Sequence, residues 1–244
     1  MMMLSGDPCV MDRWAFVRRY MRKGNVSTLD AGAGNGAFTI MAAAHGNRCL
    51  GLSFDEREMV DAASRAALVG ASRATFMVAD LRQLGALVHR LGGFDQIMCL
   101  EVVEHIMDDA TLVRALYDLT NPGGQLLLTT PSSDHRAMHG ERISASEDGG
   151  HVRWGYSTQE LHALVESAGF QVIVDGRLSG LVSQRLTALM RRIQGLHPAL
   201  GWVVVLPLRP LGLLDAVATR VARYPHLCVS VVAVRPINAS VAGH

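Results

Sequence analysis

Residues 28–39 read TLDAGAGNGAFT and hold three glycines at alternate positions, Gly32, Gly34 and Gly36. A short segment with β propensity precedes them and a helical pattern follows. This order predicts a strand, a tight turn and the N-terminus of a helix. Glycines at such a turn let the backbone approach a ligand closely. The dinucleotide fingerprint has the spacing G-x-G-x-x-G, whereas this turn has G-x-G-x-G, which disfavours a nicotinamide dinucleotide.

The segments around this turn alternate between strand-like and helix-like patterns. The runs that predict strands are residues 26–30, 49–53, 75–79, 95–100, 125–130, 170–174 and 227–234. Strands that alternate with helices predict an α/β fold with a doubly wound, mostly parallel sheet of seven strands. Such a sheet binds its ligand at the carboxyl ends of the strands. A chain of 244 residues with 49% hydrophobic residues predicts a single domain over residues 1–244.

The composition restricts the class of partner and the compartment. Because 23 basic residues nearly balance 22 acidic ones, overall charge gives no support for a nucleic-acid partner. Four cysteines are widely scattered, and the first residues resemble no secretory signal. These features predict a cytoplasmic protein with reduced thiols.

A helical insert, or lid, is predicted over residues 181–225, before the last strand. It combines apolar residues with arginines, which suits a hydrophobic small-molecule acceptor, a lipid-linked one or peripheral contact with a membrane. The alternative is that its apolar residues complete a lid or a dimer core, so the oligomeric state stays open. Its most apolar run, Trp202 to Leu206, is broken by Pro207 and Arg209 and is expected to be too short to span a bilayer.

The glycine turn and later motifs resemble those of class I S-adenosylmethionine-dependent methyltransferases, from about residue 25 to residue 170. Asp30 with the three glycines matches the first motif, whose acidic residue faces the methionine end of the cofactor in that family. Asp80 matches the acid that receives the adenine amino group there, and Pro122-Gly123-Gly124 matches a turn before an apolar strand. The resemblance implies S-adenosylmethionine as the cofactor. The residues predicted to bind it are Asp30, Gly32, Gly34, Gly36, Ser53, Asp80 and Leu81.

Ser53 departs from the family pattern. The family usually ends this strand with an Asp or Glu that accepts both ribose hydroxyls, and a neutral serine accepts weaker hydrogen bonds than a carboxylate does. Asp55 could reach the ribose, but we favour it as a helix cap. With Glu58 it resembles a capping box.

A second constellation is Glu101-Val102-Val103-Glu104-His105, at the predicted end of the fourth strand. If a helix begins here, Glu101, Glu104 and His105 share one face, because positions i, i+3 and i+4 lie together. His151, in a long polar segment before a capped helix, is a fourth candidate. Two carboxylates and two imidazoles could bind a divalent metal, and imidazole suits Mn²⁺, Fe²⁺, Co²⁺ or Zn²⁺ better than Mg²⁺.

This constellation resembles that of metal-dependent O-methyltransferases with a Glu-x-x-Glu-His motif, which act on the ends of small RNAs or in the ubiquinone pathway. The alternative interpretation is that Glu104 and His105 only shape the cofactor pocket. His135 and His139, in the same segment as His151, are either substrate contacts, rival ligands or surface residues.

The favoured reaction is O-methylation of a hydroxyl on a small, partly apolar metabolite such as a natural product, a sugar or a lipid-linked molecule. A hydroxyl must lose a proton during the transfer, which either a metal or a general base can assist. The predicted catalytic residues are Glu104, His105 and His151. The alternatives are 2′-O-methylation of an RNA 3′ end and a non-catalytic subunit that binds the cofactor.

Overall fold

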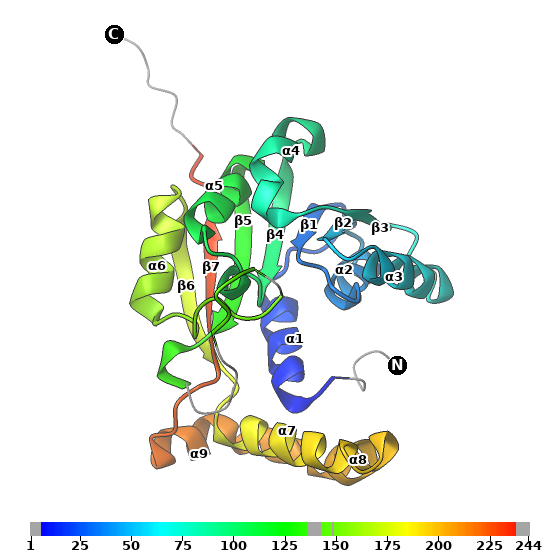
Figure 1. Cartoon of the computed structure of the whole chain (residues 1–244), viewed down its shortest axis with the longest axis vertical. Coiled ribbons are helices and arrows are strands. Elements are labelled where there is room, and N and C mark those ends of the chain that lie inside the picture. Colours follow the sequence, from blue (N-terminus) through cyan, green and yellow to red (C-terminus); the bar gives the residue numbers. More distant parts are fainter. Residues whose placement is uncertain (1–5, 136–142, 148, 238–244) are drawn as a thin grey trace.

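The computed structural model describes residues 6–135, 143–147 and 149–237. A seven-stranded sheet has the order β3-β2-β1-β4-β5-β7-β6, in which β7 runs antiparallel to both neighbours and the other adjacent strands are parallel (Figure 1). The strands are β1 (Ser27–Ala31), β2 (Arg48–Ser53), β3 (Ala74–Val78), β4 (Phe94–Leu100), β5 (Thr120–Pro131), β6 (Gln171–Leu178) and β7 (Cys228–Val234). The predicted fold class is confirmed.

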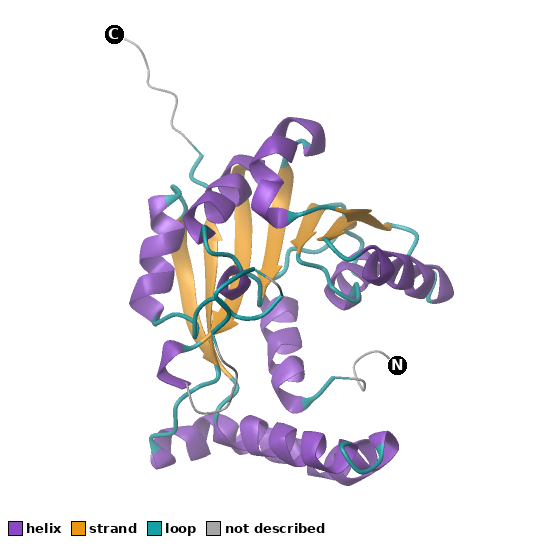
Figure 2. Cartoon of the chain, in the orientation of Figure 1, coloured by secondary structure: helices purple, strands orange, loops and turns teal. Residues whose placement is uncertain are grey.

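Helices cover both faces of this sheet (Figure 2). The helices before the insert are α1 (Pro8–Tyr20), α2 (Ala37–Ala44), α3 (Glu56–Leu68), α4 (Leu84–Leu91), α5 (Asp109–Leu119) and α6 (Thr158–Ser167). Successive residues of β4 enter opposite cores: Ile97 packs with α4, α5 and α6, whereas Met98 packs with α1 and α2. Burial on both faces explains why the central strands are continuous apolar runs without alternating polar residues.

Helix α4 is an element that the sequence pattern does not predict. Its sequence, LGALVHRL, is short and carries a glycine at its second position, which weakens the helical signal. A 3₁₀ turn (Leu81–Gln83) leads into it, and Leu84 anchors it in the core. The four cysteines are free and buried.

The insert forms α7 (Leu181–Gln194), α8 (Pro198–Val205), a 3₁₀ helix (Leu206–Leu214) and α9 (Asp215–Ala222), at the carboxyl-end edge of the sheet (Figure 1). The expectation that Pro207 and Arg209 leave the apolar run too short to span a bilayer was wrong, because the helix continues through both residues. Pro207 lies in the first turn of the 3₁₀ helix, where a missing N–H costs little, and Pro210 lies inside the same helix without ending it, so residues 199–222 stay helical. By length and composition alone, this segment of 24 residues could cross a membrane.

Candidate functional site

A pocket of about 480 Å³ lies at the carboxyl ends of β1, β2 and β4, where the strand order reverses. This is the position at which open α/β sheets bind their ligands. The lining residues are Gly32, Gly34, Ser53, Phe54, Glu58, Asp80, Leu81, Arg82, Glu101, Val102, His105, Ile106, Glu147 and Gly149. Most of the residues predicted to bind the cofactor therefore meet at one pocket.

The glycine turn forms one wall of this pocket. All three glycines have positive φ, and a Cβ at Gly32 would lie 2.3 Å from a methyl of Val102. At Gly36, a Cβ would lie 2.7 Å from the Cβ of Ala62. At Gly34, by contrast, no atom of the described chain lies within 4 Å of the position that a Cβ would take, so its backbone faces open space in the pocket. Gly32 and Gly36 are thus required by packing, whereas Gly34 leaves room for a ligand.

Asp30 lies behind the glycine turn and does not line the pocket. Its side chain is buried, and the Thr39 hydroxyl donates a hydrogen bond to it at 2.6 Å. Burial raises the pKa of this carboxyl to about 6, because desolvation disfavours the charged form. Asp30 can therefore fix the start of α2 relative to β1.

Ser53 and Asp55 have different partners at the end of β2. Asp55 accepts hydrogen bonds from the backbone N–H groups of Arg57 and Glu58, so its interpretation as a helix cap is confirmed. The expected capping box is incomplete, because the Glu58 carboxylate accepts a hydrogen bond from the Ser53 hydroxyl at 3.0 Å. Glu58 thereby brings a carboxylate into the pocket at the strand end that lacks one.

Sequence reasoning missed Glu58 as a pocket residue. We expect Glu58→Gln to weaken S-adenosylhomocysteine binding about tenfold, because a hydrogen bond from a ribose hydroxyl to a charged acceptor is stronger than one to an amide. Calorimetry would measure this. Glu56→Gln, an exposed carboxylate in the same helical turn, is the control and should bind normally. Equal affinity of the Glu58 variant and the wild type would exclude Glu58 as an acceptor of hydrogen bonds from the ribose.

Asp80 lines the pocket at the end of β3. Its carboxylate caps the following 3₁₀ turn through the N–H of Arg82 and forms an ion pair with the guanidinium of Arg82 at 2.6 Å. Hydrogen bonds from Arg82 lower the pKa of Asp80, so it is ionised near neutral pH. Leu81 lies beside it with its side chain buried.

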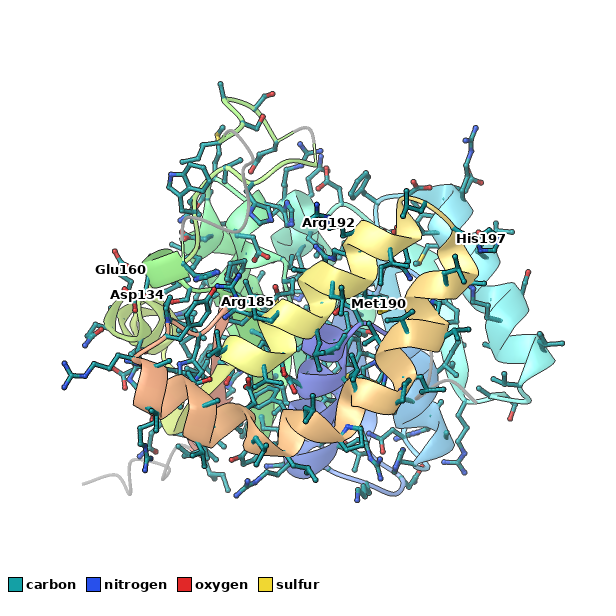
Figure 3. The ribbon with its side chains drawn as sticks, turned by 90° about the horizontal axis from the view of Figure 1, so that it is seen from below. Asp134, Glu160, Arg185, Met190, Arg192 and His197 are labelled. Carbon is teal, nitrogen blue, oxygen red and sulfur yellow. The ribbon has the colours of Figure 1, made fainter. Side chains whose placement is uncertain are left out.

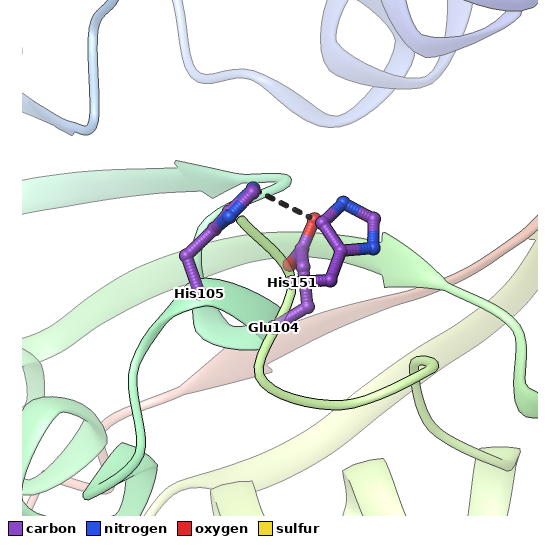
Figure 4. Close-up of side chains that lie close together, drawn as sticks. All are labelled: Glu104, His105 and His151. Carbon is purple, nitrogen blue, oxygen red and sulfur yellow. Dashed lines mark ion pairs between the residues drawn. The ribbon is translucent and has the colours of Figure 1, made fainter. Parts of the chain in front are cut away.

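Glu104, His105 and His151 bring three ligand atoms within 4.8 Å of one another (Figure 4). Glu104 and His105 come from the 3₁₀ turn after β4, and His151 comes from the segment before α6. The two imidazole rings are 4.7 Å apart, and His105 Nε2 lies 3.9 Å from Glu104 Oε1. The predicted convergence of these three residues is observed.

Hydrogen bonds orient this cluster. The Thr130 hydroxyl donates to Glu104 Oε2, whereas Glu104 Oε1 is buried without a hydrogen-bond partner among the described residues. His105 Nδ1 lies 3.1 Å from the carbonyl of Gly150. Because a carbonyl can only accept, Nδ1 carries the proton in the neutral ring and Nε2 keeps a lone pair. Burial raises the pKa of Glu104 well above its ordinary value, and the neighbouring Glu101 adds to this.

Glu101 does not join this cluster. It has a positive φ of 57°, and a 3₁₀ turn over Val103–His105 follows it, so the helical spacing expected for Glu101 and Glu104 does not form. Its carboxylate instead pairs with Arg13 of α1 at 2.9 Å and accepts a hydrogen bond from Thr129. Glu101 still lines the pocket, and it connects α1 to the end of β4.

The segment that carries His151 is held against the end of β4. The Val152 N–H donates to the carbonyl of Glu104, and Arg153 pairs with Asp109, which also accepts from the Tyr156 hydroxyl. His135 is buried against the ring of Tyr224 and lies outside the cluster. His139 lies outside the described residues.

Comparison with known proteins identifies the family. The family model described as "Methyltransferase domain" matches residues 13–174. The ubiquinone biosynthesis O-methyltransferase of Leptothrix cholodnii is 31% identical over 105 residues, which cover 43% of this chain and 44% of that protein. The chain thus matches less than half the length of this relative.

Two solved structures share the fold. An S-adenosylmethionine-dependent methyltransferase from Mesorhizobium loti has a TM-score of 0.60 and 21% identity, and the match covers 95% of this chain and all of that one. Magnesium protoporphyrin IX methyltransferase from Synechocystis, with bound S-adenosylhomocysteine, has a TM-score of 0.57 and 18% identity, over 91% of this chain and 79% of that one. Taken with the family model and the pocket at the glycine turn, these matches show that the chain belongs to the methyltransferase-domain family and is a class I S-adenosylmethionine-dependent methyltransferase.

Proposed function

We propose that this methyltransferase transfers the methyl group to a hydroxyl oxygen of a small, partly apolar acceptor. The observation that carries the proposal is the cluster of Glu104, His105 and His151 beside the pocket. A hydroxyl is a weak nucleophile until its proton is removed, and this cluster offers groups that can assist that step. The relatives named ubiquinone biosynthesis O-methyltransferase support oxygen as the acceptor atom.

The residues of the pocket support the following arrangement of the cofactor. The backbone of Gly34 would lie against the methionine end, the Glu58 carboxylate would accept hydrogen bonds from the ribose, and Asp80 with Leu81 would border the adenine. The methyl group would then face the end of β4. An acceptor oxygen that is held in line with the methyl group reacts faster, because its translational and rotational entropy is already lost on binding and no longer adds to the activation barrier.

We further propose that the cluster binds a divalent metal ion. One carboxylate and two imidazoles suit Mn²⁺, Fe²⁺, Co²⁺ or Zn²⁺ better than Mg²⁺. Glu104 Oε1 is buried without a hydrogen bond among the described residues, and His105 Nε2 keeps a lone pair, so both atoms fit a ligand role. A bound ion would compensate the buried oxygen for the water that it has lost. When bound, such an ion lowers the pKa of a coordinated hydroxyl and fixes its position.

Three groups of this chain perform separate tasks in the proposed mechanism. Glu104 would offer a buried carboxyl as a ligand, which loses its proton when the ion binds, and Thr130 fixes its orientation. His105, held by Gly150, presents Nε2 toward the acceptor side. His151 comes from a different segment, so its position depends on the contacts that hold that segment against the end of β4.

A panel of acceptors tests the proposal. We expect methyl transfer to oxygen of a hydroxylated aromatic that carries an alkyl or isoprenoid chain, detected by mass spectrometry as the gain of one methyl group. An amine analogue and a single-stranded RNA with a free 3′ end are the comparison substrates and should remain unmodified. Transfer to either comparison substrate in preference to the hydroxyl compound would refute the proposed acceptor.

A further inference from the structure

The outer surface of the insert exposes a concentration of apolar side chains. Of the 20 large hydrophobic residues that are exposed in the described chain, 11 belong to the insert. They are Leu189, Leu196, Leu200, Val203, Val204, Leu206, Leu211, Leu213, Leu214, Val217 and Val221, and we call their surface the insert face. A concentration of exposed apolar side chains on one part of a folded protein is typical of an interaction site.

The insert is also strongly cationic. Residues 181–225 contain six arginines and a single acidic residue, Asp215, although basic and acidic residues nearly balance over the whole chain. The carboxylate of Asp215 lies at the start of α7, where it accepts hydrogen bonds from the N–H groups of Gly180 and Val182. The sequence of the insert holds no other carboxylate side chain to offset the arginines.

The apolar segment of residues 199–222, which we call the α8–α9 segment, lies along α7. Figure 3, which looks onto this side, shows α7 with the α8–α9 segment alongside it. Leu186 and Met190 of α7 pack on Val205, so one side of the segment is used for folding. Cys9 and Asp7, at the start of α1, bind Thr187 and Arg191 of α7. The segment is therefore held along α7, and its opposite side is exposed.

We propose that the insert face docks on the surface of an anionic phospholipid bilayer, with the α8–α9 segment lying in the plane of the headgroups. Leucine and valine side chains would enter the boundary between headgroups and acyl chains. Arg192, Arg220 and Arg223, which are exposed, would meet the negative surface potential. Long arginine side chains can keep their charge among the headgroups while their stems cover apolar surface.

Charge favours a bilayer over a second copy of the chain as the occupant. A symmetric dimer would place the same cationic face on both subunits, so that two surfaces of like charge would meet. Anionic headgroups instead supply the opposite charge to each of them. This inference is independent of the proposed acceptor and of the metal, since it rests only on the insert.

Flotation with lipid vesicles tests docking without measuring methyl transfer. The wild type should bind vesicles that contain phosphatidylglycerol and bind phosphatidylcholine vesicles much more weakly. Leu213→Glu should reduce binding to the anionic vesicles roughly tenfold or more, because it replaces a side chain that enters the bilayer with a charge that the surface repels. Leu68→Glu is the matched control: both leucines are 87% exposed, but Leu68 lies on α3. It should bind as the wild type does.

Two further measurements separate the alternatives. The double variant Arg220→Glu and Arg223→Glu should lose binding in low salt, and about 0.5 M salt should weaken binding of the wild type, because added salt shortens the distance over which charges attract. Retained S-adenosylhomocysteine binding would show that each variant is folded. Equal binding of Leu213→Glu and Leu68→Glu to the vesicles overturns the proposal. So does a dimer in lipid-free sedimentation that Leu213→Glu abolishes, or wild-type protein that alkaline carbonate cannot extract.

Discussion

Replacing His151 with alanine should reduce methyl transfer about 100-fold and leave the affinity for S-adenosylhomocysteine nearly unchanged. The reason is that His151 reaches the cluster from the segment before α6, whereas the glycine turn that we propose to face the cofactor follows β1. Loss of one of the three proposed ligands should weaken metal retention strongly. Initial rates with saturating cofactor, and metal content measured on the same sample, would check both parts.

Chelation of the wild type should have the same effect as this substitution. A divalent chelator should suppress turnover, and Mn²⁺, Fe²⁺, Co²⁺ or Zn²⁺ should restore it better than Mg²⁺ because two of the three donors are nitrogen. His89→Ala is the control, since His89 is exposed on α4. Full activity of His151→Ala, together with no effect of the chelator, would mean that Glu104 and His105 only shape the pocket.

The second large effect is expected from Gly34→Val, which should weaken S-adenosylmethionine binding about 100-fold or more. Gly34 has a φ of 47°, and its missing side chain points into open space within the pocket. The fold has room for a side chain there, but a bound ligand would have to share that room. A β-branched residue also strains a backbone of positive φ. Calorimetry would measure the loss.

Gly70→Val separates steric exclusion from general strain. Gly70 also has a positive φ, 71°, and no atom of the described chain lies within 4 Å of the position that a Cβ would take there. It follows α3, outside the pocket. Both variants should be less stable than the wild type in thermal unfolding, but only Gly34→Val should lose the cofactor. If both bind normally, the cofactor lies away from the glycine turn.

The sequence predicts the parts of the site that depend on local order. The glycine turn, the helix cap at Asp55 and the acid after β3 each follow from a few neighbouring residues, and all three lie where the pattern indicates. The sequence groups His151 with Glu104 through the resemblance to metal-dependent O-methyltransferases. The structure supplies the physical reason, because the parallel strands end at one edge of the sheet and the segment that carries His151 returns to it.

The errors arise where a short segment admits two backbone conformations. The spacing predicts Glu101 on an α-helical face, but a positive φ and a 3₁₀ turn direct it to Arg13. The spacing of Asp55 and Glu58 fits a capping box, but it is equally compatible with a hydrogen bond between Glu58 and Ser53. Only the tertiary structure distinguishes these two arrangements. Pro207 is tolerated in the first turn of its 3₁₀ helix and Pro210 inside it, so the presence of a proline alone could not give the length of the segment.

The way in which the insert joins the sheet bears on how such enzymes diversify. Leu178, the last residue of β6, pairs with Cys228, the first residue of β7, so the whole insert is topologically an enlarged hairpin loop between adjacent antiparallel strands. Such a loop can be lengthened, shortened or exchanged without altering the register of any strand, since both of its ends stay fixed. The insert can therefore be replaced as one module, while the pocket at the ends of β1, β2 and β4, on the other half of the sheet, keeps its structure.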